Sequence, residues 1–320
     1  MTPLPISNVP PIDRNQDFTS KLRHAWPRIL LATTIALVIS YIRYDAQWKV
    51  PTISPVPFTI LGVAISIFLG FRNNAAYNRF WEARTLWGTH INSSRSFARQ
   101  VMTLVVSEDK SLRAFQEDVI MATIAYAHSF KNHLQGDDPL DGTEKLMLAQ
   151  EIEWLKTQDN VPVAILHIIG RRLQFARDAG WIAGSATIVL EGTLTELTTV
   201  QGGCERIKNT PVPYTYTLLS RTIVTFFCLL LPFGILNDAT WLTPIVTFLV
   251  SYAFCGLDAL GDEITEPFGH GPTDLPLERY SATIETNLRQ ILSDKGLPEF
   301  RASHERPVIS REHELFGTYF

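Results

Sequence analysis

Residues 51–84 read PTISPVPFTILGVAISIFLGFRNNAAYNRFWEAR. No Asp, Glu, Lys or Arg occurs from Val50 to Phe71, and Arg72 then opens a polar stretch. An α-helix rises about 1.5 Å per residue, so this uncharged run is long enough to cross a hydrocarbon layer of about 30 Å. The run therefore predicts a membrane-spanning helix that continues beyond the membrane after Phe71.

Two kinds of side chain recur at helical spacing within this run. The large apolar set is Val63, Ile67 and Phe71, and the small set is Gly62, Ser66 and Gly70. Small residues let helix backbones approach closely in lipid, where packing holds helices together. If several copies of the helix surrounded an axis, the large set would form stacked apolar rings, which is the neck of a pore. Spacing alone also allows this set to face lipid, with the small set in ordinary helix packing.

The chain of 320 residues is segregated into apolar and polar parts. Its averages conceal this, because it is 46% hydrophobic and 19% charged, with a mean hydropathy of +0.06 and a net charge of −4. Apolar residues gather at 29–42, 50–71, 222–237 and 239–257. The first stretch reaches a spanning length of about 20 residues only if it includes Trp26, Pro27 and Arg28, and we expect Arg28 to extend to the interface. Four membrane spans are therefore predicted.

The polar part of the chain is patterned as helices, without an alternating strand pattern. The predicted helices cover 79–106, 111–134, 144–156, 163–179 and 187–207. Asp141 and Glu144 resemble a capping box, and Pro232 is expected to kink or break the third span. The chain is thus predicted to be an all-α membrane protein. Its expected parts are an N-terminal segment 1–25, two spans with the neck helix 26–84, a helical region 85–210, two further spans 211–260 and a C-terminal segment 261–320.

Basic residues are distributed unequally about the predicted spans. They precede the first span, follow the second and precede the third, whereas the two short opposite loops hold only Arg43 and Lys49. The positive-inside rule places both termini and region 85–210 in the cytoplasm. Residues 1–15 are Pro-rich without an apolar core, so no signal peptide is predicted.

Motifs for catalysis and metal binding are missing from the sequence. It has no phosphate-binding Gly-x-x-x-x-Gly-Lys loop, no Gly-x-Ser-x-Gly elbow and no His-Glu-x-x-His helix. Cys204, Cys228 and Cys255 lack ligand spacing and are expected to pack as free thiols, and His128 and His133 are five apart, a poor fit to a metal-binding helix. The sequence predicts no enzyme, cofactor, metal or nucleic-acid partner.

Several ordered motifs resemble the bestrophin family in its bacterial branch. Residues 70–88 read GFRNNAAYNRFWEARTLWG, which looks like the family's span-to-helix signature. Residues 201–207 read QGGCERI, with NTP at 209–211, LPFG at 231–234 and EPFG at 266–269, in the family's order. The resemblance covers about residues 26–292.

The resemblance implies a pentameric helical ion channel in the bacterial inner membrane, with an axial pore through membrane and cytoplasm. Family neck positions map onto Val63, Ile67 and Phe71, the set found above from spacing. A second constriction, the cytoplasmic aperture, maps onto Ile188, with Ile182 as the other candidate. The bacterial branch favours monovalent cations, and the net charge of −4 points weakly the same way. We therefore expect small monovalent ions to permeate, and cations in preference to anions.

Acidic residues near the end of the fourth span have two interpretations. Asp258, Asp262, Glu263 and Glu266 could attract cations or act as acid–base groups, or could pair with Arg72, Arg79 or Arg84. Beyond them, residues 270–276 read HGPTDLP, where animal relatives carry the acidic run that binds calcium. Only Asp274 remains, so we expect no calcium requirement.

Two other classes of protein fit the same spans. A secondary transporter would place polar groups near mid-membrane at broken helices, and only Pro232 offers such a break. A membrane-anchored scaffold or signalling protein would need only the cytoplasmic helices. Ion flux through the purified protein separates the three classes.

Overall fold

The computed structural model describes residues 14–45, 50–271 and 273–293, with the side chains of residues 14–24 excepted. These residues form helices without strands, and one isolated bridge joins Val105 and Ile182. The helices are α1 (Arg14–Tyr44), α2 (Pro55–Leu104), α3 (Leu112–Gln135), α4 (Ala149–Leu155), α5 (Val161–Asp178), α6 (Gly184–Asn209), α7 (Tyr214–Ala239), α8 (Thr243–Glu263) and α9 (Leu277–Ser293). Residues 1–13 and 294–320, which belong to the expected terminal segments, lie outside the described residues.

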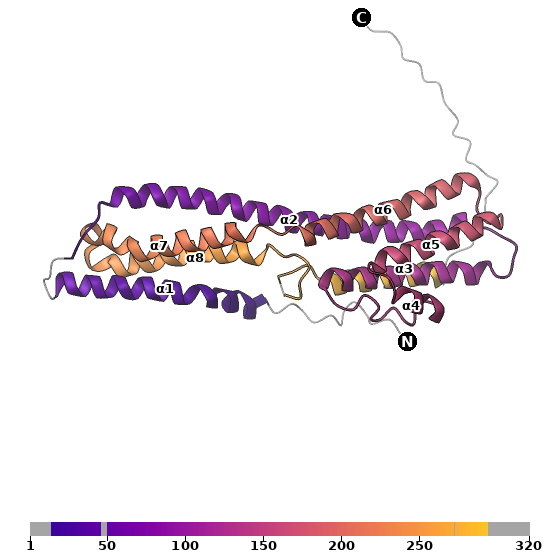
Figure 1. Ribbon diagram of the computed structural model, residues 1–320, viewed down its shortest axis with the longest axis horizontal. Helices are drawn as coiled ribbons and strands as arrows, with labels where there is room; N and C mark the ends of the chain where they lie inside the picture. Colours follow the sequence, from indigo (N-terminus) through magenta and orange to yellow (C-terminus); the bar gives the residue numbers. More distant parts are fainter. Residues whose placement is uncertain (1–13, 46–49, 272, 294–320) are drawn as a thin grey trace, which may run out of the picture.

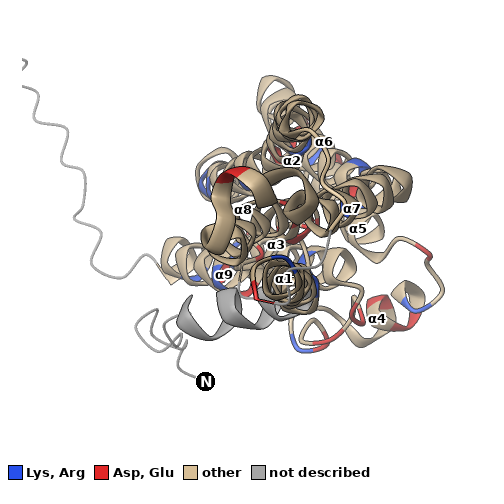
Figure 2. Ribbon diagram, turned by 90° about the vertical axis from the view of Figure 1, so that its left-hand side faces the viewer, with Lys and Arg blue, Asp and Glu red and all other residues tan. Residues whose placement is uncertain are grey.

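The helices form two bundles end to end, joined by α2 (Figure 1). The membrane bundle contains α1, the first half of α2, α7 and α8, and the extramembrane bundle contains the rest of α2 with α3, α5, α6 and α9 (Figure 1). The short helix α4 lies at the periphery, away from α2 and α6 (Figure 2). Because α2 is one helix of 50 residues, the membrane bundle and the extramembrane bundle share a single rod.

The apolar stretches form four antiparallel spans. Three continuous helical stretches have the length and hydropathy to cross a membrane: Ala25–Tyr44, Pro55–Leu104 and Tyr214–Glu263. The third reverses at a 3-10 turn, Thr240–Leu242, where Thr240 has a positive φ of 48°, so it contributes α7 and α8 side by side (Figure 1). The four predicted spans are confirmed. Helix α7 nevertheless runs on through Pro232, where the sequence predicted a kink or break.

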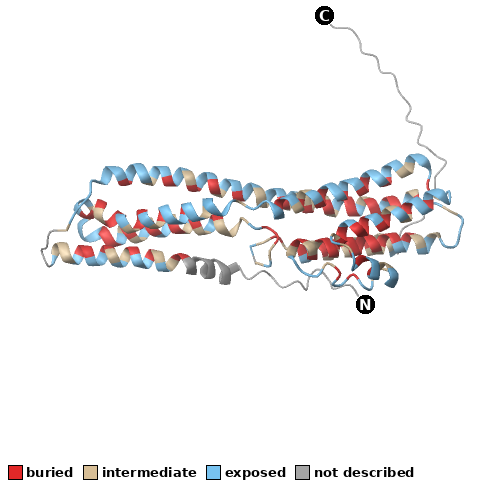
Figure 3. Cartoon of the chain, in the orientation of Figure 1, coloured by how far each residue is buried: buried red, intermediate tan, exposed pale blue. Residues whose placement is uncertain are grey.

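The extramembrane bundle holds most of the buried side chains (Figure 3). Trp87 and Phe97 of α2, Tyr126 and Phe130 of α3 and Ile165 of α5 are fully buried and fill its centre. Burial of a large apolar side chain is worth about 1.5–3 kcal/mol, so this core stabilises the packing of the helices of this bundle. The side chains of Cys204, Cys228 and Cys255 are also buried, with free thiols.

Two sequence predictions in this bundle need correction. The helix expected at 144–156 begins only at Ala149, because residues 141–147 form turns. The Glu151 carboxylate accepts the backbone N–H of Leu148 at 3.2 Å, so the acidic cap belongs to Glu151 and not to Glu144. Helix α9 was not predicted, although Leu277, Ile284 and Leu288 are buried against the core with helical spacing.

Candidate functional site

One face of α2 in the membrane bundle is apolar and uncovered. Val63, Ile67 and Phe71 are 56%, 55% and 74% exposed. The opposite face carries Ile65 and Leu69, which are 6% and 1% exposed and pack within the membrane bundle. The three residues predicted for the neck therefore lie on one face, about 6 Å apart along the helix, and their own subunit leaves that face open.

The small residues of the same helix have different surroundings. A Cβ added to Gly62 would lie 3.4 Å from the Phe227 ring, so Gly62 permits close contact with α7. Gly70 has no neighbour within 4 Å of an added Cβ, and the exposed Ser66 donates to the Gly62 carbonyl at 2.8 Å. Of the two glycines, Gly62 faces α7 closely, whereas Gly70 faces open space within the described subunit. A packing role for Ser66 and Gly70 stays a prediction and would require a second subunit.

A buried ion-pair network lies immediately beyond Phe71. The Arg72 guanidinium donates to Asp258 Oδ1 at 2.9 Å, to Ser220 Oγ at 2.9 Å and, more closely still, to the Asp262 carboxylate. Arg28 donates to Asp258 Oδ2 at 3.1 Å. The side chain of Asp258 is fully buried and that of Arg72 is 5% exposed. Such charges are tolerated away from water only when they are paired and hydrogen-bonded, as they are here.

This network decides between the two interpretations for Asp258 and Asp262. Asp258 and Asp262 pair with Arg72, and Asp262 also accepts from Arg221 at 2.9 Å. Arg79 instead donates to the Ile207 carbonyl at 2.7 Å, and Arg84 lies over the Tyr280 ring at 5.1 Å. The pairing interpretation is confirmed for Arg72. Arg28, which was expected to extend to the interface, turns inward to Asp258.

The two aperture candidates have opposite environments. Ile188, in the second turn of α6, is 75% exposed. Ile182 is 4% exposed and bridges Val105, so its own subunit covers it. Glu191, one turn beyond Ile188, is also exposed, and no ion pair of its carboxylate is found in the described part of the chain. The structure thus leaves Ile188 available to line a channel and encloses Ile182.

The comparisons with known proteins agree with this architecture. The family model for "Bacterial/Fungal Bestrophin protein" matches residues 19–290. The chain belongs to this bestrophin family. A relative from Salmonella typhi, voltage-dependent anion channel-forming protein YneE, is 38% identical over 78% of this chain and 81% of its own length. A voltage-dependent anion channel-forming protein of Ralstonia nicotianae is 33% identical over 89% of this chain and 92% of its own length.

Solved bestrophin structures have the same fold as this chain. A crystal structure of a bacterial bestrophin homolog from Klebsiella pneumoniae, in a form that carries one mutation, superposes with a TM-score of 0.79. The identity is 34%, over 86% of this chain and 98% of that chain. Bestrophins are membrane ion channels and not enzymes, so the all-α membrane fold and the channel class predicted from the sequence are confirmed.

The loop after α8 is closed by hydrogen bonds among its own residues. The Asp274 carboxylate accepts the backbone N–H of Gly271 at 2.7 Å, and the Leu275 N–H donates to the Pro267 carbonyl at 2.9 Å. Asp274 therefore closes its own loop. Among the described residues, no group of three or more His, Cys, Asp or Glu side chains is arranged to hold a metal ion. Independence from calcium stays a prediction.

Sequence reasoning missed three members of the ion-pair network: Arg28, Ser220 and Arg221. Ser220 and Arg28 lie 38 and 230 positions from Asp258 in the chain. The only available signal was their position at the ends of predicted spans, where polar side chains in a bestrophin bundle need partners. Which of the several nearby carboxylates would provide that partner depended on how α1, α7 and α8 pack.

Proposed function

We propose that five copies of this bestrophin surround an axis and conduct ions through a pore lined by α2. The observation that carries the proposal is the exposed apolar face of Val63, Ile67 and Phe71 on a helix whose other face is packed. A single four-span subunit cannot surround an axial pore, and closed rings are the usual solution for heterologous contacts. The unequal Lys and Arg distribution supports a bacterial inner-membrane orientation with both termini and the extramembrane bundle in the cytoplasm.

The neck would act through dewetting and ring diameter. Apolar rings about 6 Å apart along the axis present no hydrogen-bonding group to a hydrated ion, so passage depends on whether water fills the constriction. Asn74 and Asn78 follow on exposed positions of α2 and would rehydrate the ion. The exposed Ile188 would form the cytoplasmic aperture further along the axis.

We propose small monovalent cations as the permeant ions. Five copies of the exposed Glu191 carboxylate would place negative charge one turn from the Ile188 aperture, which favours cations there. The relatives' names, which describe anion channels, make anion conduction the second candidate. The reversal potential in a KCl gradient distinguishes cation from anion conduction. If cations are preferred, Glu191→Gln should move the reversal potential toward zero. An anion-selective reversal potential that Glu191→Gln leaves unchanged would contradict cation preference.

Ion flux through purified protein in liposomes tests the channel. Replacing Val63, Ile67 and Phe71 together by Ala should widen the neck and raise single-channel conductance severalfold. The matched control replaces Leu30, Leu37 and Val38 of α1, which are also exposed and apolar, by Ala and should leave conductance unchanged. Calcium chelation should not close the channel.

Three outcomes would contradict the proposal. Unchanged conductance in the α2 triple variant, with the assembly intact, would place the stripe against lipid or protein. Slow saturating uptake without discrete current steps would indicate a transporter. The absence of any flux would indicate a membrane-anchored scaffold or signalling protein.

A further inference from the structure

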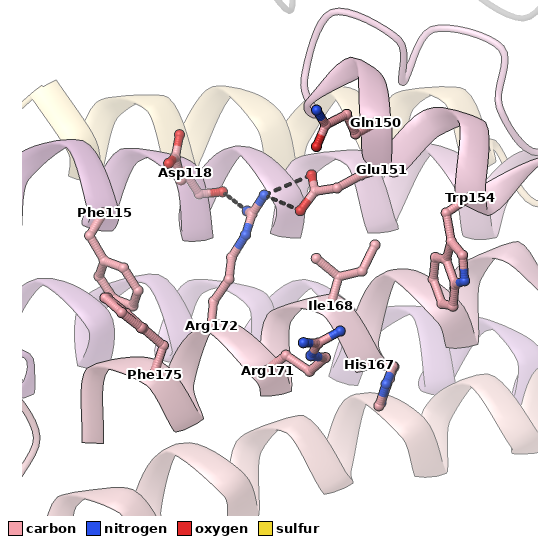
Figure 4. A pocket seen from close by; sticks show the side chains of 10 residues that line it. All are labelled: Phe115, Asp118, Gln150, Glu151, Trp154, His167, Ile168, Arg171, Arg172 and Phe175. Atoms are coloured by element: carbon pink, nitrogen blue, oxygen red, sulfur yellow. Dashed lines mark hydrogen bonds and ion pairs between the residues drawn. The ribbon is translucent and has the colours of Figure 1, made fainter. Parts of the chain in front are cut away.

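A cleft in the extramembrane bundle lies outside the proposed pore face. It has a volume of about 460 Å³ and lies between α3, α4 and α5 (Figure 4). Phe115 and Phe175 form one end, Trp154 and His167 form the other, and Ile168 lies between them (Figure 4). Ligand sites in proteins commonly have volumes of about 300–1,000 Å³ with mainly apolar walls and a few placed polar groups. This cleft has those properties.

The inner polar group of the cleft is already neutralised. Arg172 Nη2 donates to both carboxylate oxygens of Glu151 at 2.8 Å, and Arg172 Nη1 donates to the Asp118 carbonyl at 2.6 Å. Both carboxylate oxygens accept from the same guanidinium nitrogen, and the ion pair ties α4 to α5 at the inner wall of the cleft.

The neighbouring arginine is available. Arg171 lines the cleft, its side chain is exposed, and no acceptor for its guanidinium is found in the described part of the chain. Figure 4 shows this guanidinium between Ile168 and His167, while the Asp118 carboxylate points away from it. The formal charges of the lining balance, because it holds Asp118 and Glu151 as well as Arg171 and Arg172, but Arg171 presents a planar set of donors to the aromatic-walled cleft without an acceptor, and such donors match a carboxylate.

We propose that the cleft binds a small aromatic carboxylate. The carboxylate would accept a bidentate pair of hydrogen bonds from Arg171, and the ring would lie over Ile168 between Trp154 and Phe175. Trp154 and Phe175 are 41% and 62% exposed, so a ring of that size would cover apolar surface that now faces water. The charge selects an acid over a neutral ring, and the aromatic walls select a flat ligand over an aliphatic one.

The cleft also contacts the start of the helix that carries the aperture candidate. Phe115 and Phe175 both meet the Trp181 ring edge-on, with centroids 5.5 Å and 6.0 Å away. The Trp181 carbonyl accepts the Val106 N–H at 2.9 Å, and α6 begins three residues later at Gly184. A ligand that moves Phe175 would move Trp181 and so bias the position of Ile188. This regulatory step rests on the proposed channel function, whereas the binding step does not.

Calorimetry on the purified assembly tests binding, with 2-naphthoate as the probe and 2-naphthamide as its neutral counterpart. Wild-type protein should bind 2-naphthoate saturably at low millimolar concentration or below, and the amide at least about tenfold more weakly. Arg171→Gln should weaken 2-naphthoate binding by about tenfold or more, and Arg171→Lys by less. Arg177→Gln, on the same helix outside the cleft, is the matched control and should bind as the wild type does.

Each variant is compared only after native mass measurement shows the wild-type assembly. Equal affinity of wild type and Arg171→Gln, equal affinity for the acid and the amide, or no saturable binding to the wild type would overturn the site. Trp154→Leu with undiminished binding would overturn the aromatic wall.

Flux measurements in liposomes test the regulatory step separately. Saturating 2-naphthoate should change wild-type flux by twofold or more and leave Arg171→Gln flux unchanged. If wild type and Arg171→Gln respond alike, the ligand acts elsewhere, for example in the pore, and the regulatory step is overturned. If no variant conducts, the proposed channel function fails while the calorimetric result stands by itself.

Discussion

Asp258 connects three helices of the membrane bundle through one buried carboxylate. Its oxygens accept hydrogen bonds from Arg28 of α1, Arg72 of α2 and Ser220 of α7. Because Arg72 follows Phe71 directly, the same carboxylate fixes the end of the proposed neck. The network therefore links the stability of the bundle to the position of the innermost apolar ring.

We predict that Asp258→Ala destabilises the protein by about 3–5 kcal/mol, because it leaves the Arg72 guanidinium buried with one carboxylate fewer. Thermal unfolding in detergent should show a clear loss of stability. Asp238→Asn, at an exposed acidic position near the end of α7, is the control and should change the midpoint little. A midpoint for Asp258→Ala equal to the wild type would show that the network contributes nothing net.

At the scale of elements, α9 is held on α3 by a polar contact as well as by its apolar face. The Glu285 carboxylate lies 2.8 Å from His128 Nε2 and accepts from Arg289 Nε at 2.8 Å. The hydrogen bond from His128, with a further contribution from Arg289, lowers the pKa of Glu285 to about 2. An unfolded Glu has a pKa of about 4.3, so the folded state favours the ionised carboxylate.

This pKa difference predicts the direction of a pH effect. The stabilisation by Glu285 is fully present above about pH 4.3 and is lost as the pH falls toward about 2. Hydrogen exchange of α9 amides should be faster in Glu285→Gln than in wild type at pH 6, by an amount that corresponds to about 1 kcal/mol or less, and the difference should narrow on acidification. Arg279→Gln, at an exposed position of α9, is the control. A difference that grows at low pH would contradict the assignment.

For the whole molecule, the described subunit leaves apolar surface uncovered along residues 56–81 of α2. Val63, Ile67, Phe71 and Trp81 are all more than half exposed, on a helix that runs through both bundles. The first three lie on the proposed pore face, while neighbouring subunits would have to cover the flanks. The subunit is therefore incomplete as a channel by itself.

We predict a closed ring of five subunits, measured as a native mass of five times 36.1 kDa in detergent. The mass should not depend on protein concentration over the working range, because an obligate ring has no stable folded monomer at those concentrations. A closed ring with a different number of subunits would change the diameter of the neck but keep the architecture. A stable monomer that conducts would eliminate the axial pore.

The sequence by itself determined the class of the protein. Three local properties predicted four spans, an all-α fold and the family. They are the absence of charge over a spanning length, the four-residue spacing of apolar side chains, and the ordered Gly-, Cys- and Pro-containing motifs. The apolar set on α2 was also visible, because helical periodicity places Val63, Ile67 and Phe71 on one face whatever surrounds them.

Tertiary structure alone decided what each side chain meets. Ile182 and Ile188 are equivalent in sequence terms, yet Ile182, before α6, is buried where it bridges Val105, whereas Ile188 on α6 is exposed. Tertiary packing likewise gives Arg28 a carboxylate partner 230 residues away. It also forms the cleft of about 460 Å³, whose walls come from three helices. Burial and pairing depend on contacts between distant segments, and no local pattern encodes them.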